Sequence, residues 1–243
     1  METLSEFINT ERARFSTRHN NLLAFSFSQI SRYYEFLKII KERYHKTSSE
    51  FIENSKAKHA TFQSGTNTVT DEQMQLLNKG KEITTTLHLE IESYFLFAKI
   101  LLDKIARAIE FYFGQARGLS LNSHDDLVKN FGNYTFTKRL TVPSTELNEL
   151  MRNLKECVSD YRDKEIAHEK SPRVMKATMF SHGATSTTWI ASTKIYPTEK
   201  DKQVESKEID QAMTIVDKYI EQIIKYIQMN RAKTILEKSD LTK

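Results

Sequence analysis

The stretch ITTTLHLEIESYFLFAKILLDKIARAIEFY, residues 83–112, decides the fold class of this chain of 243 residues. Its apolar side chains recur at steps of three and four residues, which is the spacing of one face of an α-helix. They are Ile83, Leu87, Ile91, Tyr94, Ala98, Leu101, Ile105, Ala108 and Tyr112. Further apolar residues widen this stripe, so the sequence predicts a long central helix that packs against several others.

Two more segments have helical periodicity. Residues 20–44 are rich in aromatic side chains, and residues 209–227 carry a row of isoleucines. The chain has only six glycines and three prolines, which favours long helices over strands and turns. We expect a loop or linker in the polar stretch 45–69, and a helix that starts just after Thr70, because Thr70 and Gln73 form a capping box.

A second core helix is predicted to begin at Pro143-Ser144-Thr145-Glu146, where a hydroxyl cap precedes an early acidic residue. Its apolar seam consists of Leu147, Leu150, Met151, Leu154, Val158 and Tyr161. We expect the preceding residues 131–141 to be irregular and the helix to stop before Pro172.

Composition changes after that helix. Residues 174–180 and 187–196 are rich in Val, Thr, Ile and Met, and a Gly-containing turn separates them, which predicts a β-hairpin at about 174–196. The predicted fold class is therefore mainly all-α: an antiparallel helical bundle with one inserted β-hairpin and an N-terminal helical extension. We expect two regions, a helical arm and linker over residues 1–69 and the bundle over residues 70–243, with fraying from Arg231 onward.

Composition also limits the chemistry. Lys and Arg number 36 against 32 Asp and Glu, a mildly basic balance that is compatible with RNA. The single cysteine, Cys157, excludes a disulfide framework, and the seven dispersed histidines form no metal-binding motif. The start of the chain does not resemble a secretory signal, and the most apolar run, residues 94–102, is too short to cross a membrane. We expect a cytoplasmic protein without metal, cofactor or membrane contact.

The segment YRDKEIAHEK, residues 161–170, carries the candidate chemistry. It places Arg162, Asp163 and His168 at the end of the second core helix. On an ideal α-helix, Arg162 and His168 are about 9 Å apart along the axis and about 120° apart around it. Three arrangements can bring them together: the arginine side chain swings round, the helix frays near Ala167, or a second copy of the chain completes the pair.

The segment from Tyr161 to His168 resembles the R-x(4–6)-H motif of the HEPN superfamily, including the polar residue after the arginine and the Ala-His ending. The helix that contains residues 94–107 is similar to the first core helix of these domains, so that the resemblance covers about the last two-thirds of the chain. The resemblance implies a HEPN-type bundle. Catalytic members of this family cut RNA without metal, in a groove where two copies of the motif meet across a homodimer.

The resemblance also implies a role for each residue. His168 would act as base or acid, Arg162 would hold the phosphate, and Asp163 would orient one of them. Tyr161, Lys164 and Lys170 would contact flanking phosphates. Related ribonucleases act as toxins or in phage defence, which implies an antitoxin-like protein partner. No tyrosine follows His168 in Glu169-Lys170-Ser171, which departs from the branch that is silenced by adenylylation.

Other interpretations stay open on the sequence. A non-catalytic HEPN-like module could bind a nucleotide or a protein partner, with Arg162 and His168 kept as a structural pair. A purely structural helical dimer would bury the motif helix. The motif residues could also be ordinary charges at a solvated helix end.

Overall fold

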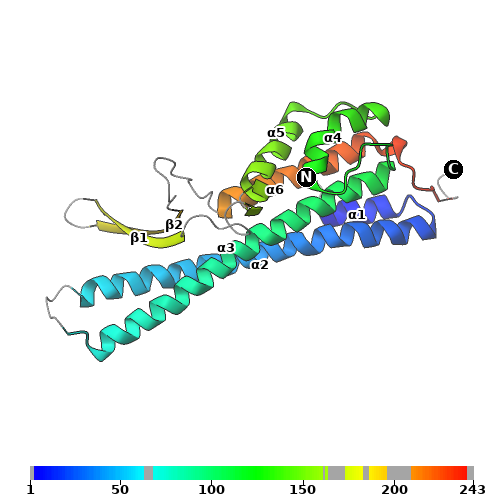
Figure 1. Cartoon of the computed structure of the whole chain (residues 1–243). Helices are drawn as coiled ribbons and strands as arrows, with labels where there is room; N and C mark the ends of the chain where they lie inside the picture. Colours follow the sequence, from blue (N-terminus) through cyan, green and yellow to red (C-terminus); the bar gives the residue numbers. More distant parts are fainter. Residues whose placement is uncertain are drawn as a thin grey trace. The chain divides into compact units, whose positions relative to one another are not determined.

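The computed structural model describes residues 3–62, 68–160, 162–163, 173–182, 186–195 and 209–239. This part of the chain is mainly helical, as the sequence predicted (Figure 1). Its elements are α1 (Leu4–Arg12), α2 (Thr17–Thr61), α3 (Asp71–Phe113), α4 (His124–Thr137), α5 (Thr145–Leu154), the π-helix η1 (Lys155–Asp160), β1 (Arg173–His182), β2 (Ser186–Ile195), α6 (Ile209–Met229) and the 3₁₀ turn η3 (Arg231–Lys233).

The chain forms two compact units, and α2 and α3 contribute a part to each. Unit 1 comprises residues 1–38, 95–163 and 209–243, and unit 2 comprises residues 39–94 and 164–208.

The predicted central helix is α3. It begins at Asp71 as expected, because the Thr70 hydroxyl accepts a hydrogen bond from the Gln73 backbone N–H and the Gln73 side chain accepts one from the Thr70 backbone. Its unit 1 portion lies at the centre of the core, with these residues almost completely buried: Phe95, Ala98, Leu101, Leu102, Ile105, Ala106, Ile109 and Tyr112. The helix ends at Gly114, whose φ of 84° is a left-handed conformation that glycine adopts without strain.

The expectation of irregular structure at residues 131–141 was wrong for its first half, because α4 continues to Thr137. Its buried face includes Leu127, Phe131 and Tyr134, and the Tyr134 hydroxyl donates to the Gly114 carbonyl at 2.7 Å. This tertiary packing outweighs the weak helix propensity of the sequence GNYTFT.

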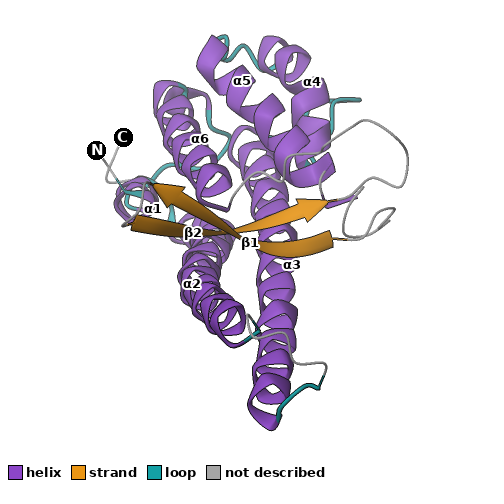
Figure 2. Cartoon of the chain, turned by 90° about the vertical axis from the view of Figure 1, so that its left-hand side faces the viewer, coloured by secondary structure: helices purple, strands orange, loops and turns teal. Residues whose placement is uncertain are grey.

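The helix start at Ser144 is confirmed, since its side chain accepts a hydrogen bond from the Leu147 backbone N–H at 3.1 Å. The predicted seam is also buried at Leu147, Leu150, Met151, Leu154 and Val158, and its last member, Tyr161, lies outside the described residues. In unit 1, α5 packs against α4 and α6, and Figures 1 and 2 both show these three helices side by side.

Residues near the two ends of the chain contact each other in unit 1, so the expected fraying from Arg231 onward was wrong for the described residues 231–239. Fully buried Glu11 accepts hydrogen bonds from the Arg14 side chain and from the Tyr112 hydroxyl, and it pairs with Arg231 at 3.4 Å. Phe15 forms a β-bridge with Lys238. These contacts connect α1 to the residues that follow α6.

In unit 2, the loop expected at residues 45–69 is helical as far as Thr61. Its serines and threonines suggested a loop, yet their hydroxyls donate to carbonyls one turn earlier, as Thr47 does to Arg43 and Ser55 to Phe51. The helix also packs on α3, where the Asn54 side chain donates to the Leu76 carbonyl at 3.2 Å. Gly80 does not interrupt α3; a Cβ at this position would lie 2.6 Å from the Asn54 side-chain oxygen.

The strands β1 and β2 pair antiparallel, and Figure 2 shows them in orange. Their register joins Arg173 to Ile195 at one end and His182 to Ser186 at the other. β1 begins one residue before the segment of about 174–196 for which the composition predicted strands.

Candidate functional site

The candidate site lies at the end of the second core helix, where the helix changes type. After Leu154 the hydrogen bonding becomes that of a π-helix over Lys155–Asp160, and Arg162 and Asp163 have the same conformation. Cys157, Val158 and Ser159 are three consecutive buried residues there. An α-helix at a surface rarely buries three consecutive residues, so this turn is covered by the rest of the protein around more of its circumference than an ordinary surface helix. Such π-helical turns are frequent at functional sites.

Arg162 and Asp163 form an ion pair directly after this turn. Arg162 Nε donates to Asp163 Oδ1 at 2.7 Å, and Nη2 donates to the same oxygen. The two side chains are 32% and 47% exposed, so the pair adds little to stability but restricts the guanidinium orientation. The structure thus brings together two of the three predicted catalytic residues.

The other predicted site residues, Tyr161, Lys164, His168 and Lys170, lie outside the described residues. The separation of Arg162 and His168 was calculated for an ideal α-helix, whereas Lys155–Asp160, Arg162 and Asp163 are π-helical. The predicted offset of about 120° also depends on residues 164–168, which lie outside the described residues.

A second polar cluster surrounds the first turn of α4 in unit 1. The Lys99 ammonium is 5% exposed and contacts Asp103 at 2.9 Å and Asp125 at 2.8 Å. Asp103 also accepts a hydrogen bond from the His124 backbone N–H at 2.8 Å. Burial acts to raise the pKa of Asp125. The hydrogen bond from Lys99 and its positive charge outweigh this effect, so the pKa of Asp125 is lowered. This cluster fixes the start of α4 on α3.

The His124 ring is completely buried beside this cluster. Neither ring nitrogen has a hydrogen-bond partner in the described part of the chain, and the nearby hydroxyl of Tyr219 has none either. Burial, assisted by the positive charge of Lys99, lowers the pKa of His124 to about 3. The ring is therefore neutral at pH 7. Sequence analysis missed this cluster, although a lysine inside the most apolar run was a usable signal.

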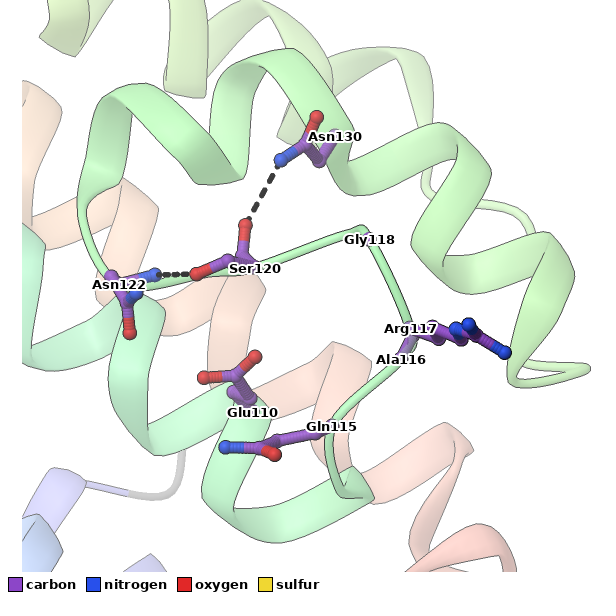
Figure 3. A pocket seen from close by; sticks show the side chains of 8 residues that line it. All are labelled: Glu110, Gln115, Ala116, Arg117, Gly118, Ser120, Asn122 and Asn130. Atoms are coloured by element: carbon purple, nitrogen blue, oxygen red, sulfur yellow. Dashed lines mark hydrogen bonds between the residues drawn. The ribbon is translucent and has the colours of Figure 1, made fainter.

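A polar pocket of about 680 Å³ lies at the loop between α3 and α4. Figure 3 shows Glu110 and Gln115 beside each other at its floor, and Arg117 pointing away from it. The loop is held by the Asn130 side chain, which donates to the Ser120 carbonyl at 2.9 Å. The lining offers mainly amide and carboxylate groups, which suit a small polar ligand better than a polyanion.

Among the residues that the structure describes, no group of three or more His, Cys, Asp or Glu side chains could hold a metal ion. No described helix is both long and apolar enough to cross a membrane. No family model, curated protein or solved structure matches the chain.

Proposed function

We propose that the protein is a metal-independent endoribonuclease of the HEPN type, in which Arg162 and His168 act at a cleft shared by two copies of the chain. The observation that carries the proposal is the Arg162–Asp163 pair directly after the π-helical turn. In this pair Asp163 orients the partly exposed guanidinium of Arg162, and His168 follows Arg162 by six residues in the sequence.

The arginine suits the reacting phosphate. A guanidinium has five N–H donors, and the contacts to Asp163 use two of them. The remaining donors can bind phosphate oxygens and stabilise the negative charge that increases in the transition state. A carboxylate that holds the guanidinium in one orientation lowers the entropy lost when the phosphate binds.

The histidine supplies the proton transfer. The His168 imidazole takes the proton from the 2′-hydroxyl of RNA while the 2′-oxygen attacks the adjacent phosphorus. The bond from phosphorus to the 5′-oxygen breaks, and a protonated imidazole, which the second copy can supply, donates a proton to that oxygen. The products are a 2′,3′-cyclic phosphate and a free 5′-hydroxyl, and no metal is required.

The proposal places the protein among cytoplasmic ribonucleases that act as toxins or in phage defence, with an antitoxin-like protein as a possible partner. The direct test is incubation of the purified protein with single-stranded RNA in the presence of EDTA. Cleavage that ends in 2′,3′-cyclic phosphate supports the proposal. RNA that stays intact under these conditions opposes it.

The polar pocket favours a second candidate function, a non-catalytic module that binds a nucleotide or a similar small molecule. Its ligand would contact Glu110 and Asn130, which are distant in sequence from the motif at residues 161–170. Calorimetric titration with nucleosides and nucleotides tests this alternative. Binding that is lost in Asn130→Ala and unchanged in Arg162→Ala would support it.

A further inference from the structure

Helix α2 carries an exposed apolar ridge in unit 1. The ridge consists of exposed Leu22, Phe25 and Phe36 and half-buried Tyr33, with half-buried Gln29 at its centre. Leu22 is 41% exposed, Phe25 is 68% exposed and Phe36 is 36% exposed. On a helix, residues four and seven positions from Gln29 lie within about 40° of its direction, so the five side chains share one face.

Helix α3 widens this face. The Phe97 ring lies 5.5 Å from the Phe36 ring and 6.0 Å from the Tyr33 ring, as centroid distances. The Arg32 guanidinium is 5.4 Å from the centre of the Tyr33 ring. We use the name α2–α3 patch for Leu22, Phe25, Gln29, Tyr33, Phe36 and Phe97.

The size of the patch matches the apolar part of a protein interface. At roughly 200 Å² for each large side chain, its apolar residues expose on the order of 350 Å². A specific interface covers about 800 Å² per partner, of which rather more than half is non-polar. A patch of this size on a monomer is often functional.

The spacing of the ridge indicates what covers it. Leu22 and Phe36 lie seven residues before and after Gln29, and Phe25 and Tyr33 lie four residues before and after it. Two such helices packed antiparallel about a two-fold axis at Gln29 place Leu22 of each copy against Phe36 of the other. Phe25 then faces Tyr33, and the two Gln29 amides meet at the axis. This self-complementarity is what a two-fold interface requires.

We propose that two copies of the chain associate through the α2–α3 patch, with α2 antiparallel to its counterpart and Gln29 on the two-fold axis. The proposal goes beyond the proposed ribonuclease function and does not depend on it. Association through the end of the motif helix, which the resemblance implied, uses a different surface, so a chain that uses both surfaces forms an assembly of more than two copies.

The first test is the mass in solution. Light scattering of the intact chain at micromolar concentration should return at least twice 28.4 kDa. Phe25→Glu should halve the measured mass, because it places a charge in the apolar centre of the interface. The exposed position and the helix propensity of glutamate preserve the fold, which circular dichroism checks. The matched control is Phe136→Glu, at a phenylalanine that is 86% exposed on α4 and should leave the dimer intact.

The second test is cysteine crosslinking in a Cys157→Ser background. Gln29→Cys should oxidise to a linked dimer, because this position faces itself across the axis. Leu22→Cys alone should not, since the two copies of position 22 lie 14 residues, or about 21 Å, apart along the helices. Combining Leu22→Cys with Phe36→Cys should restore the crosslink.

Three results would overturn the proposal. They are a monomeric intact chain, a mass that does not change in Phe25→Glu, and self-crosslinking of Leu22→Cys, which indicates a parallel pair. If Phe25→Glu reduces RNA binding while the intact chain is monomeric, the patch is a stacking surface for RNA instead. If His168→Ala loses RNA cleavage but keeps the association of the intact chain, that result bears on the proposed ribonuclease function and not on the α2–α3 patch.

Discussion

His124 and Tyr219 meet edge to face inside unit 1, with ring centroids 5.7 Å apart and ring planes at 87°. Both residues are fully buried, and the described part of the chain supplies no hydrogen-bond partner for either ring nitrogen or for the phenol hydroxyl. A buried histidine in such surroundings makes the stability of the protein depend on pH.

The first prediction concerns this dependence. An unfolded histidine takes up a proton near pH 6.5, whereas burial lowers the pKa of His124 in the folded protein to about 3. As pH falls below about 6.5, protonation favours the unfolded chain, so stability is present above that value and is lost toward pH 3. This residue should reduce the free energy of unfolding by about 2 kcal/mol between pH 7 and pH 5.

Urea unfolding of the intact chain and of His124→Leu at both pH values measures this difference. Between pH 7 and pH 5, the leucine variant should lose about 2 kcal/mol less than the intact chain. An equal loss in His124→Leu and the intact chain would show that His124 is not the responsible group.

The second prediction concerns the junction of the chain ends. Glu11→Ala removes a buried carboxylate and leaves Arg14, Arg231 and the Tyr112 hydroxyl without this partner. Breaking such a buried pair should cost about 3 kcal/mol in the free energy of unfolding. The control Glu53→Ala, from the exposed pair of Glu53 with Lys56, should cost less than about 1 kcal/mol. If both variants lose a similar free energy of unfolding, the buried contacts of Glu11 stabilise the protein no more than an exposed ion pair does.

The sequence predicted those parts of the fold that local patterns determine. The stripe from residue 83 to 112 predicted α3, and Ser144 predicted the start of α5, because helical spacing and capping depend on neighbouring residues only. The Glu11–Arg231 pair joins residues at opposite ends of the chain, and no local pattern indicates it. The helix over residues 45–61 was missed because serine and threonine hydroxyls bond within a helix as well as within a turn.

The residues of the candidate site could be predicted from the sequence motif, but the conformation of the helix that carries them could not. The residues Arg162, Asp163 and His168 could be selected from the sequence, and the Arg162–Asp163 contact is local. The π-helical turn before them contains three consecutive buried residues, Cys157, Val158 and Ser159, which a spacing of three and four residues does not predict. The neutral state of His124 likewise depends on packing from α6.

The third prediction concerns Glu90 in unit 2. This carboxylate is 3% exposed; the Thr47 hydroxyl and Arg43 contact one of its oxygens, and the other has no partner in the described residues. Burial raises the pKa of Glu90, against the lowering effects of Thr47 and Arg43. A raised pKa means that this group favours folding at low pH and opposes it as pH rises through the folded-state pKa.

Glu90→Gln should therefore raise the melting temperature at pH 7, by about 2–4 °C for each kcal/mol gained. The gain should shrink as pH falls toward 4, where the glutamate of the intact chain is itself protonated. Calorimetry at the two pH values measures this gain, with Glu53→Gln, at the exposed carboxylate that pairs with Lys56, as the control. A melting temperature that falls at pH 7 would mean that the charge of Glu90 is needed by Arg43.

The last prediction concerns catalysis by the motif. Cleavage of single-stranded RNA in EDTA should fall by about 10²- to 10⁴-fold in His168→Ala, because the proton carrier is lost. Arg162→Ala should reduce the rate by about 10²-fold or more through lost charge stabilisation of the transition state. Asp163→Ala should reduce it less, because Asp163 only orients the guanidinium.

A matched control separates these effects from loss of fold or of general RNA affinity. Arg152 is an exposed arginine in the last turn of α5, so Arg152→Ala removes one positive charge from the same helix without touching the motif. It should cleave RNA as fast as the intact chain. Because Arg162 is partly exposed, Arg162→Ala should keep the melting temperature of the intact chain within a few degrees. If Arg162→Ala and His168→Ala both cleave RNA at the rate of Arg152→Ala, the activity belongs to another site and the motif has no catalytic role.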